Sequence, residues 1–247
     1  MNSEENETAD QISEVEGRAR VLVGWQLKLA ACIAFLWSAF QMWYASPLPF
    51  LFKIGVFIDV PARGIHLCFA LLLSFLLFPL LKTRRLNPVH FTDFILALGG
   101  GYCALYLYLE YVALVDRNGV LLEIPFSFYS LNMSFPFELL LGSFGICVLL
   151  EATRRAIGLP LVIVAIVFLL YSFFGQSMPD VIAHQGLSFS RLIGYQWLGG
   201  EAIFGIPISV SVSFVFLFVL FGSMLDRAGG GRYFLNLAVA LVGRFRG

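Results

Sequence analysis

The chain has 247 residues, of which 59% are apolar, 16% aromatic and only 13% charged, and its formal net charge is zero. A soluble domain carries about a quarter charged residues and has no need of several apolar stretches of about 20 residues each. The composition therefore excludes a soluble globular domain and predicts an all-α integral membrane protein, for which no nucleic-acid partner is expected.

The first region is an acidic tail. Residues 1–17 hold six of the 16 acidic residues of the chain and show no apolar periodicity, which predicts a disordered segment over residues 1–24. A secretory signal would begin with basic residues and end at a small-residue cleavage site, and this sequence has neither. The first apolar helix is therefore expected to remain attached to the chain.

Hydropathy predicts about six transmembrane helices. They cover residues 25–45, 62–81, 91–115, 137–153, 159–175 and 203–225. With the N-terminus in the cytoplasm, eleven Lys and Arg residues outside these spans fall on the cytoplasmic side and four on the other side. Short cytoplasmic loops retain Lys and Arg, so both termini are predicted to be cytoplasmic.

Two stretches outside the spans keep helical periodicity. Residues 188–198 place Phe189, Leu192 and Trp197 on or near one face, and residues 232–245 are apolar, short and flanked by arginines. Segments of this kind favour amphipathic helices that lie along the membrane surface. The predicted fold is therefore about six transmembrane helices plus two interfacial amphipathic helices.

The sequence holds no local constellation for catalysis. It has no Walker loop, and its three histidines lie on three different segments, which excludes a local zinc-helix motif or triad. The four cysteines are scattered one to a span, and Gly99, Gly101 and Ala104 lie mid-span, where small residues favour close helix packing. We expect no enzyme activity, no catalytic residue, no cofactor and no metal ligand.

Acidic residues in or beside the spans are the stronger clue, because a carboxylate in hydrocarbon is costly unless it is partnered or hydrated. Asp93 and Glu110 lie at opposite ends of one span, about 25 Å apart at about 1.5 Å per residue, and are interpreted as interfacial, with a role in ion passage as the alternative. Glu151 is expected to pair with Arg154 or Arg155, which follow it at helical spacing.

Glu201 stands in a stretch whose backbone is loosened by glycine and proline. Gly199, Gly200, Gly205 and Pro207 surround it at the start of the sixth span. Transporters use interrupted helices to expose helix ends to substrate or ion, and ordinary helix entry loops also contain Gly and Pro. A transport role and a structural role both stay open for Glu201.

The last hundred residues resemble the permease of tripartite ATP-independent periplasmic (TRAP) transporters. The resemblance rests on Gly-Ile-Pro at 205–207, Phe-Gly at 221–222, the glycine turn at 229–231, and Gly243 with Arg246 and Gly247. The fit is closest to the fused type, in which a small four-helix subunit and a large subunit form one polypeptide. Residues 25–153 resemble the four-helix part by span count and by the RGIHL sequence at 63–67, which leaves residues 154–247 as the start of the large subunit.

This resemblance implies a permease component of a secondary transporter in the bacterial inner membrane. It would take up organic anions such as carboxylates, driven by the sodium gradient, and a periplasmic solute-binding protein would deliver them. In the family, the hairpins that hold substrate and sodium follow this region, so the chain is expected to be the N-terminal part of a longer permease. Its other partners would be the lipid bilayer and the remaining large-subunit transport domain, which carries the sodium ligands.

Three loops, at residues 46–61, 116–136 and 176–202, are expected to face the binding protein. The third is the first choice, because its helix and Glu201 lie beside the sixth span; Arg191, Trp197 and Glu201 are the candidate docking or gating residues. Two other classes stay open. One is a stand-alone scaffold or assembly subunit, or a fragment without transport activity, and the other is a membrane enzyme, which would need a polar cluster facing one cavity.

Overall fold

A computed structural model describes residues 19–80, 88–117, 120–128 and 131–242. Most of the predicted acidic tail therefore lies outside the described residues. The same holds for the basic loop at 82–85 and for the family-like motif at 243–247.

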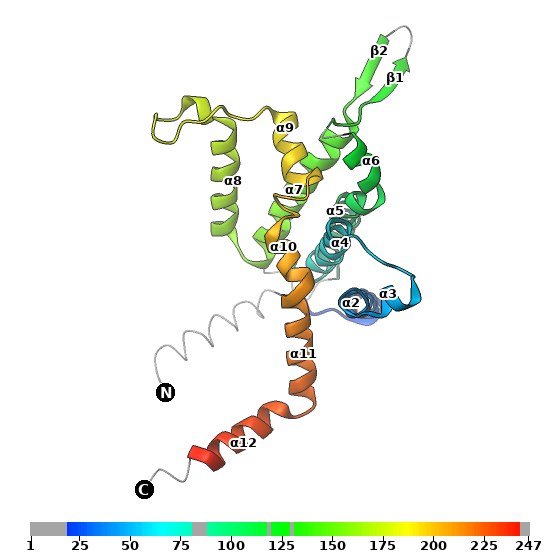
Figure 1. Cartoon of the computed structure of the whole chain (residues 1–247), viewed down its shortest axis with the longest axis vertical. Coiled ribbons are helices and arrows are strands. Elements are labelled where there is room, and N and C mark those ends of the chain that lie inside the picture. The colour runs from blue at the N-terminus through cyan, green and yellow to red at the C-terminus, as the bar shows by residue number, and fades with distance from the viewer. Residues whose placement is uncertain (1–18, 81–87, 118–119, 129–130, 243–247) are drawn as a thin grey trace.

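Helices occupy all six places where spans are predicted (Figure 1). They are α2 (Gly24–Ala45), α4 (Asp59–Leu77), α5 (Phe91–Leu109), α7 (Phe137–Ala156), α8 (Leu159–Phe173) and the continuous stretch of α10 (Ile206–Val210), η4 (Ser211–Val215) and α11 (Phe216–Arg227). Shorter helical elements are α3 (Leu48–Phe52), α6 (Tyr111–Asp116), η2 (Gly175–Ser177), α9 (Phe189–Ile193), η3 (Gly194–Leu198) and α12 (Gly230–Val242). The predicted all-α membrane fold is confirmed.

One exception to the helical pattern lies in the predicted loop at 116–136. Strands β1 (Ile124–Phe128) and β2 (Leu131–Phe135) pair there as an antiparallel hairpin, with Ile124 opposite Phe135. The hairpin projects from the end of the bundle beside α6 (Figure 1). We refer to this end of the α4–α5–α7 bundle as the hairpin end.

Four helices among the described residues are long and apolar enough to cross a membrane: α2, α4, α5 and the stretch Ile206–Arg227. Helix α8 is apolar but has 15 residues, about 22 Å at about 1.5 Å per residue, which is less than the hydrocarbon core of about 30 Å. Helix α7 has 20 residues but carries charged side chains near both ends. Helices α7 and α8 therefore lie where spans are predicted, but they are not among the four helices that are long and apolar enough to cross a membrane.

Helix boundaries follow local backbone chemistry. The predicted span at 91–115 ends early, at Leu109, because Glu110 leaves helical geometry and separates α5 from α6. Gly158 makes the turn between α7 and α8 at φ 125°, a backbone conformation that residues other than glycine rarely adopt. Proline lies in the first turn of both α8 and α10, where its missing N–H would have no helical partner.

The core lies where α4, α5 and α7 pack against one another. It includes Leu71 and Phe75 of α4, Ala104 and Leu107 of α5, and Val148 of α7. Close approach depends on glycine, since a Cβ on Gly100 would lie 2.5 Å from the Val148 side chain. The predicted role of Gly99, Gly101 and Ala104 in helix packing is confirmed: an added Cβ would lie 2.9 Å from Phe144 at Gly99 and 3.3 Å from Cys68 at Gly101, and Ala104 is fully buried.

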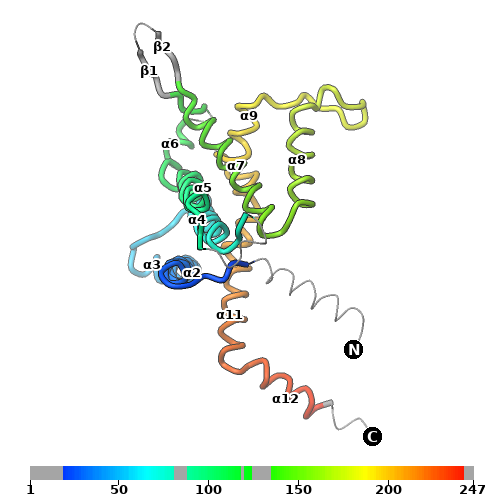
Figure 2. Tube along the Cα trace, turned by 180° about the vertical axis from the view of Figure 1, so that it is seen from behind, coloured from blue at the N-terminus to red at the C-terminus, as the bar shows by residue number. Residues whose placement is uncertain are grey.

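The C-terminal helices lie differently. Figures 1 and 2 show α11 and α12 extending away from the bundle, with α8 beside α7. Helix α12 begins at Gly230 and covers the described part of the second predicted amphipathic helix. Most side chains of α11 and α12 are exposed.

Candidate docking groove and its supporting polar network

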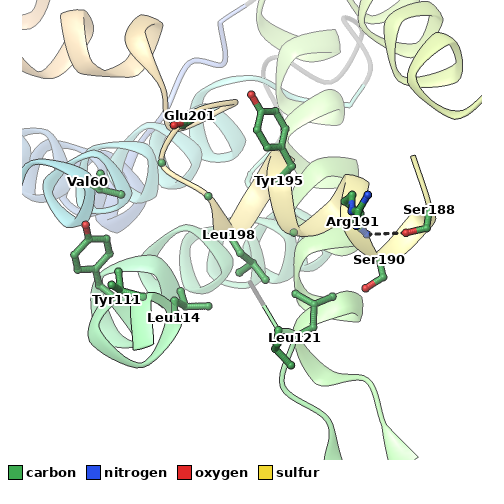
Figure 3. Close-up of a pocket in the computed structure, with 15 residues that line it drawn as sticks. Val60, Tyr111, Leu114, Leu121, Ser188, Ser190, Arg191, Tyr195, Leu198 and Glu201 are labelled. Atoms are coloured by element: carbon green, nitrogen blue, oxygen red, sulfur yellow. Dashed lines mark hydrogen bonds between the residues drawn. The ribbon is translucent and has the colours of Figure 1, made fainter. Parts of the chain in front are cut away.

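A groove of about 910 Å³ lies at the hairpin end of the bundle (Figure 3). Its walls come from the start of α4, from α6 and the segment after it, and from α9, η3 and the following turn. Its lining includes Val60, Tyr111, Leu121, Arg191, Tyr195 and Glu201. Two of the three candidate docking residues, Arg191 and Glu201, therefore line one groove.

Arg191 and Glu201 lie toward different ends of the groove (Figure 3). Both are exposed, and neither forms an ion pair with any described residue. The Ser188 hydroxyl accepts a hydrogen bond from the Arg191 backbone N–H at 3.4 Å, which caps the start of α9 without involving the guanidinium. Both charges are therefore available to a partner.

Trp197 lies behind the groove in the core, and its side chain is fully buried. Its indole Nε1–H donates to the Cys103 carbonyl of α5 at 3.0 Å. The ring fills the space over two glycines of α7, and a Cβ on Gly145 would lie 2.3 Å from it. The structure thus gives Trp197 a role in holding the groove wall, whereas surface docking would require exposure.

The same packing explains where the predicted amphipathic helix at 188–198 lies. It forms α9 and the π-helical turn η3, and its apolar residues Leu192 and Ile193 are buried. The Ile193 side chain packs directly against Gly142 of α7, because a Cβ added at Gly142 would lie 2.5 Å from Ile193 Cγ2. The apolar face of this helix therefore covers the bundle.

Arg63 ties the Glu201 loop to α4. Its Nη1 donates to the Phe204 carbonyl at 2.8 Å and to the Gly200 carbonyl at 3.4 Å, while Nη2 pairs with the carboxylate of Asp59 one turn away. Two backbone carbonyls of a glycine-rich loop thereby gain a charged donor. Arg63 belongs to the RGIHL sequence, but its carbonyl partners lie more than a hundred residues away, so sequence spacing does not identify them.

Glu138 holds the opposite wall. Its buried carboxylate accepts hydrogen bonds from Arg117 Nη2 at 2.6 Å, the Tyr106 hydroxyl at 2.8 Å and the Leu122 backbone N–H at 2.7 Å. Burial alone would lower the pKa of Arg117, but the hydrogen bond and charge of Glu138 outweigh it and hold that pKa above its ordinary value. Arg117 therefore stays protonated and fixes the segment after α6 to the start of α7.

The other end of the bundle carries a second ionic cluster. Asp93 is buried between two arginines, accepting from Arg20 Nη2 at 2.8 Å and from Arg155 Nη1 at 2.7 Å. Asp93 lies in the first turn of α5, and its interpretation as an interfacial residue stays a prediction, while its two arginine partners come from segments outside its own helix. The predicted pairing of Glu151 is confirmed, with Arg154 at 2.8 Å and with Arg155 at 2.7 Å.

The described residues also show how the other chemically reactive side chains are distributed. Within residues 19–80, 88–117, 120–128 and 131–242, no group of three or more His, Cys, Asp or Glu side chains could hold a metal ion. The four cysteines are free, and two of them are exposed.

Comparison with known proteins bears on the C-terminal part of the chain. Residues 144–247 match the family model described as the tripartite ATP-independent periplasmic transporter, DctM component. The matched range begins within α7 and includes Arg191, Glu201 and α10 to α12. No curated protein and no solved structure matches the chain.

Proposed function

Because residues 144–247 match the family model of the DctM component of TRAP transporters, we propose that the chain is a permease component of a secondary, binding-protein-dependent uptake transporter. The family match is the observation that carries this proposal. The imported solute is an organic anion such as a carboxylate, and the sodium gradient drives its uptake. The protein lies in the bacterial inner membrane with both termini in the cytoplasm.

Within this transporter, the described residues serve mainly as a scaffold. Residues 25–153 are the small-subunit-like region and residues 154–247 the start of the large-subunit-like region, a boundary close to the beginning of the family match. The buried carboxylates Asp93 and Glu138 support a scaffold role, since arginine side chains already pair with both. Their charges hold helices together and are not free to follow a solute.

The groove with Arg191 and Glu201 is the docking surface for the periplasmic binding protein. Its support is a wide groove with two exposed charges of opposite sign that form no ion pair with a described residue, on a loop that Arg63 and Trp197 fix to the bundle. Charges at the rim of an interface mainly raise the rate of productive encounter and select the orientation of the partner. The partner is expected to present an acidic group to Arg191 and a basic group to Glu201.

Uptake by the transporter with all its components tests the proposal. Cells that produce it with its binding protein would be offered labelled carboxylates with and without an inward sodium gradient. The double variant Arg191→Glu with Glu201→Lys should lower uptake about tenfold at a limiting concentration of binding protein, because rim charges govern association. A large excess of binding protein should restore part of the loss.

The matched control reverses two exposed charges at the other end of the same region, Asp226→Lys with Arg227→Glu. This control should transport as the wild type does. Undiminished uptake in the Arg191 and Glu201 variant would overturn the docking role but would not contradict the proposed permease function. Absence of sodium-dependent carboxylate uptake in the wild type would remove the proposed coupling and solute class.

A scaffold or assembly subunit without transport is the second candidate. It is favoured by the same observation, that the buried carboxylates Asp93 and Glu138 are paired with arginines. It predicts that the chain purifies in a stable complex with a separate transport protein. Solute uptake would then follow that partner when the two proteins are reconstituted separately.

A further inference from the structure

A buried polar network, here called the His66 network, joins three helical elements, α2, α4 and η4. Its members are Trp37 and Gln41 of α2, His66 of α4, and Ser211 and Val212 of η4. Gln41 is fully buried and His66 is 5% exposed. The sequence offered one signal for this site, the histidine in RGIHL, but the remaining members are separated from it by up to 146 positions.

The hydrogen bonds fix the protonation of the imidazole. His66 Nδ1 lies 3.1 Å from Trp37 Nε1 and 2.9 Å from Gln41 Nε2. An indole N–H can only donate, so Nδ1 must be an unprotonated acceptor. A neutral ring then carries its proton on Nε2, which donates to the Ser211 hydroxyl at 3.1 Å.

A second bond from α2 ends in the same turn. The amide Nε2 of Gln41 also donates to the Val212 carbonyl at 3.2 Å. Orientation of the amide follows from this contact, because the alternative orientation would place two oxygens together. Helices α2 and α4 therefore each place one hydrogen bond on adjacent residues of η4.

The turn that they contact has π-helical geometry. The Phe216 N–H donates to the Ser211 carbonyl five residues earlier, and the Phe216 ring packs against Trp37 with centroids 4.7 Å apart. π-Helices are rare, occur mostly as single turns inside α-helices and are frequently found at functional sites. In an apolar environment no water replaces a lost hydrogen bond, so bonds from neighbouring helices decide whether the turn persists.

We infer that His66, as the neutral Nε2–H tautomer, is a positioning residue that holds η4 in its π-helical form and so sets the rotation of α11 about its axis. If η4 became α-helical, the following residues would turn by about 100° relative to α4, the angle of one residue in a helix of 3.6 residues per turn. The bundle would then face a different side of α11. This inference goes beyond the proposed function, because it depends on neither the solute nor the direction of transport.

Indole resonances of the full chain in lipid nanodiscs test the tautomer. The chain has four tryptophans, and Trp37→Phe identifies the Trp37 N–H signal by its loss. His66→Leu should shift this signal upfield, and His66→Asn should restore it, because Asn Oδ1 lies near the position of Nδ1 and can accept. His66→Gln places its amide near Nε2 instead, so it should leave the Trp37 signal shifted.

Trp197 is the internal control for folding, because its N–H bonds to the Cys103 carbonyl away from this network. Its signal should be unchanged in all four variants. A Trp37 signal at the same position in the wild type and in His66→Leu, with Trp197 unchanged, would overturn the assignment of Nδ1 as the acceptor.

A second measurement tests the rotation of α11. Single cysteines carrying spin labels would be placed at 217 to 220, with the exposed Cys32 and Cys147 replaced by serine. Accessibility to oxygen should be high at 218 and 219 and lower at 217 and 220 in the wild type, following the exposure of these residues. His66→Leu and Gln41→Leu should each move this pattern by one residue. A shifted Trp37 signal with an unmoved pattern would reduce His66 to a local packing residue and overturn the positioning role.

Discussion

The α4–α5–α7 bundle and the helix that runs through α10, η4 and α11 differ in a way that hydropathy alone does not predict. In the stretch Ile206–Arg227, an 18-residue apolar window has a mean hydropathy of 2.3 and 6% of its residues are buried. The corresponding window of α4 has a mean hydropathy of 1.8, and 50% of its residues are buried. Lipid chains are as apolar as leucine, so an apolar surface gains little by facing another helix. Burial in this chain instead follows close approach through small residues and pairing of polar groups.

The two regions show this difference residue by residue. In the bundle, Gly100 and Gly145 admit neighbouring side chains, and Asp93 and Glu138 join helices through ion pairs. In α11, Gly222 has nothing within 4 Å of the position of an added Cβ. Among the described residues, the hydrogen bonds between the α10–η4–α11 stretch and other helices come from Ser211 and Val212 of η4, in the His66 network.

The largest effect should follow from breaking the buried ionic cluster. Asp93→Ala leaves Arg20 and Arg155 buried without their shared carboxylate, and loss of one partner of a buried pair costs about 3–5 kcal/mol. The free energy of unfolding, measured by SDS titration in mixed micelles, should fall by that amount. The control Asp59→Ala removes a largely exposed carboxylate from its pair with Arg63 and should cost at most about 1 kcal/mol. Equal losses of unfolding free energy in the two variants would contradict the distinction between a buried and an exposed ion pair.

Truncation of one phenylalanine in each region should sharpen the comparison. Phe75 of α4 is fully buried and its ring lies 4.9 Å from the Arg155 guanidinium carbon. Phe75→Ala should cost about 3 kcal/mol, the low end for this substitution, because the cavity remains while the transfer contribution is small in lipid. Phe218 of α11 is 72% exposed, and Phe218→Ala should change the free energy of unfolding by about 0.5 kcal/mol or less. A large loss at Phe218 in the isolated chain would place α11 inside a packed core.

The smallest effect compares two helical glycines. Gly145→Ala pushes a methyl group into the Trp197 ring, and overpacking of this kind costs about 1–3 kcal/mol. Gly222→Ala meets no neighbour and should stabilise the chain by up to about 1 kcal/mol through helix propensity. Opposite signs in the SDS titration are the expected result. Two destabilising changes would show that α11 also approaches another surface closely.

The sequence predicts those features of the fold that depend on local pattern. Apolar runs place the helices, and the spacing of Glu151 to Arg154 and Arg155 predicts their ion pairs. The hairpin at 124–135 was not predicted, because its strands are short and lie in a segment expected to be a loop.

The candidate site was only partly predictable. Glycine and proline around Glu201 point to a loop that lines the groove, but burial of Trp197 follows from Gly142 and Gly145, about fifty residues earlier. The partners of Glu138 and Asp93 likewise come from other helices, so the spacing along one helix could not reveal them. Long-range pairing of this kind requires the packing of the bundle to be known.

The bond between Trp197 and the Cys103 carbonyl has a consequence for the order of assembly. A ribosome delivers α4, α5 and α7 to the membrane before residue 197 is made, and domains generally fold in the order of their synthesis. The space over Gly142 and Gly145 must therefore stay accessible until the indole arrives, or reopen to admit it. Insertion of one late tryptophan then completes the groove, and its fluorescence would report that moment during biogenesis.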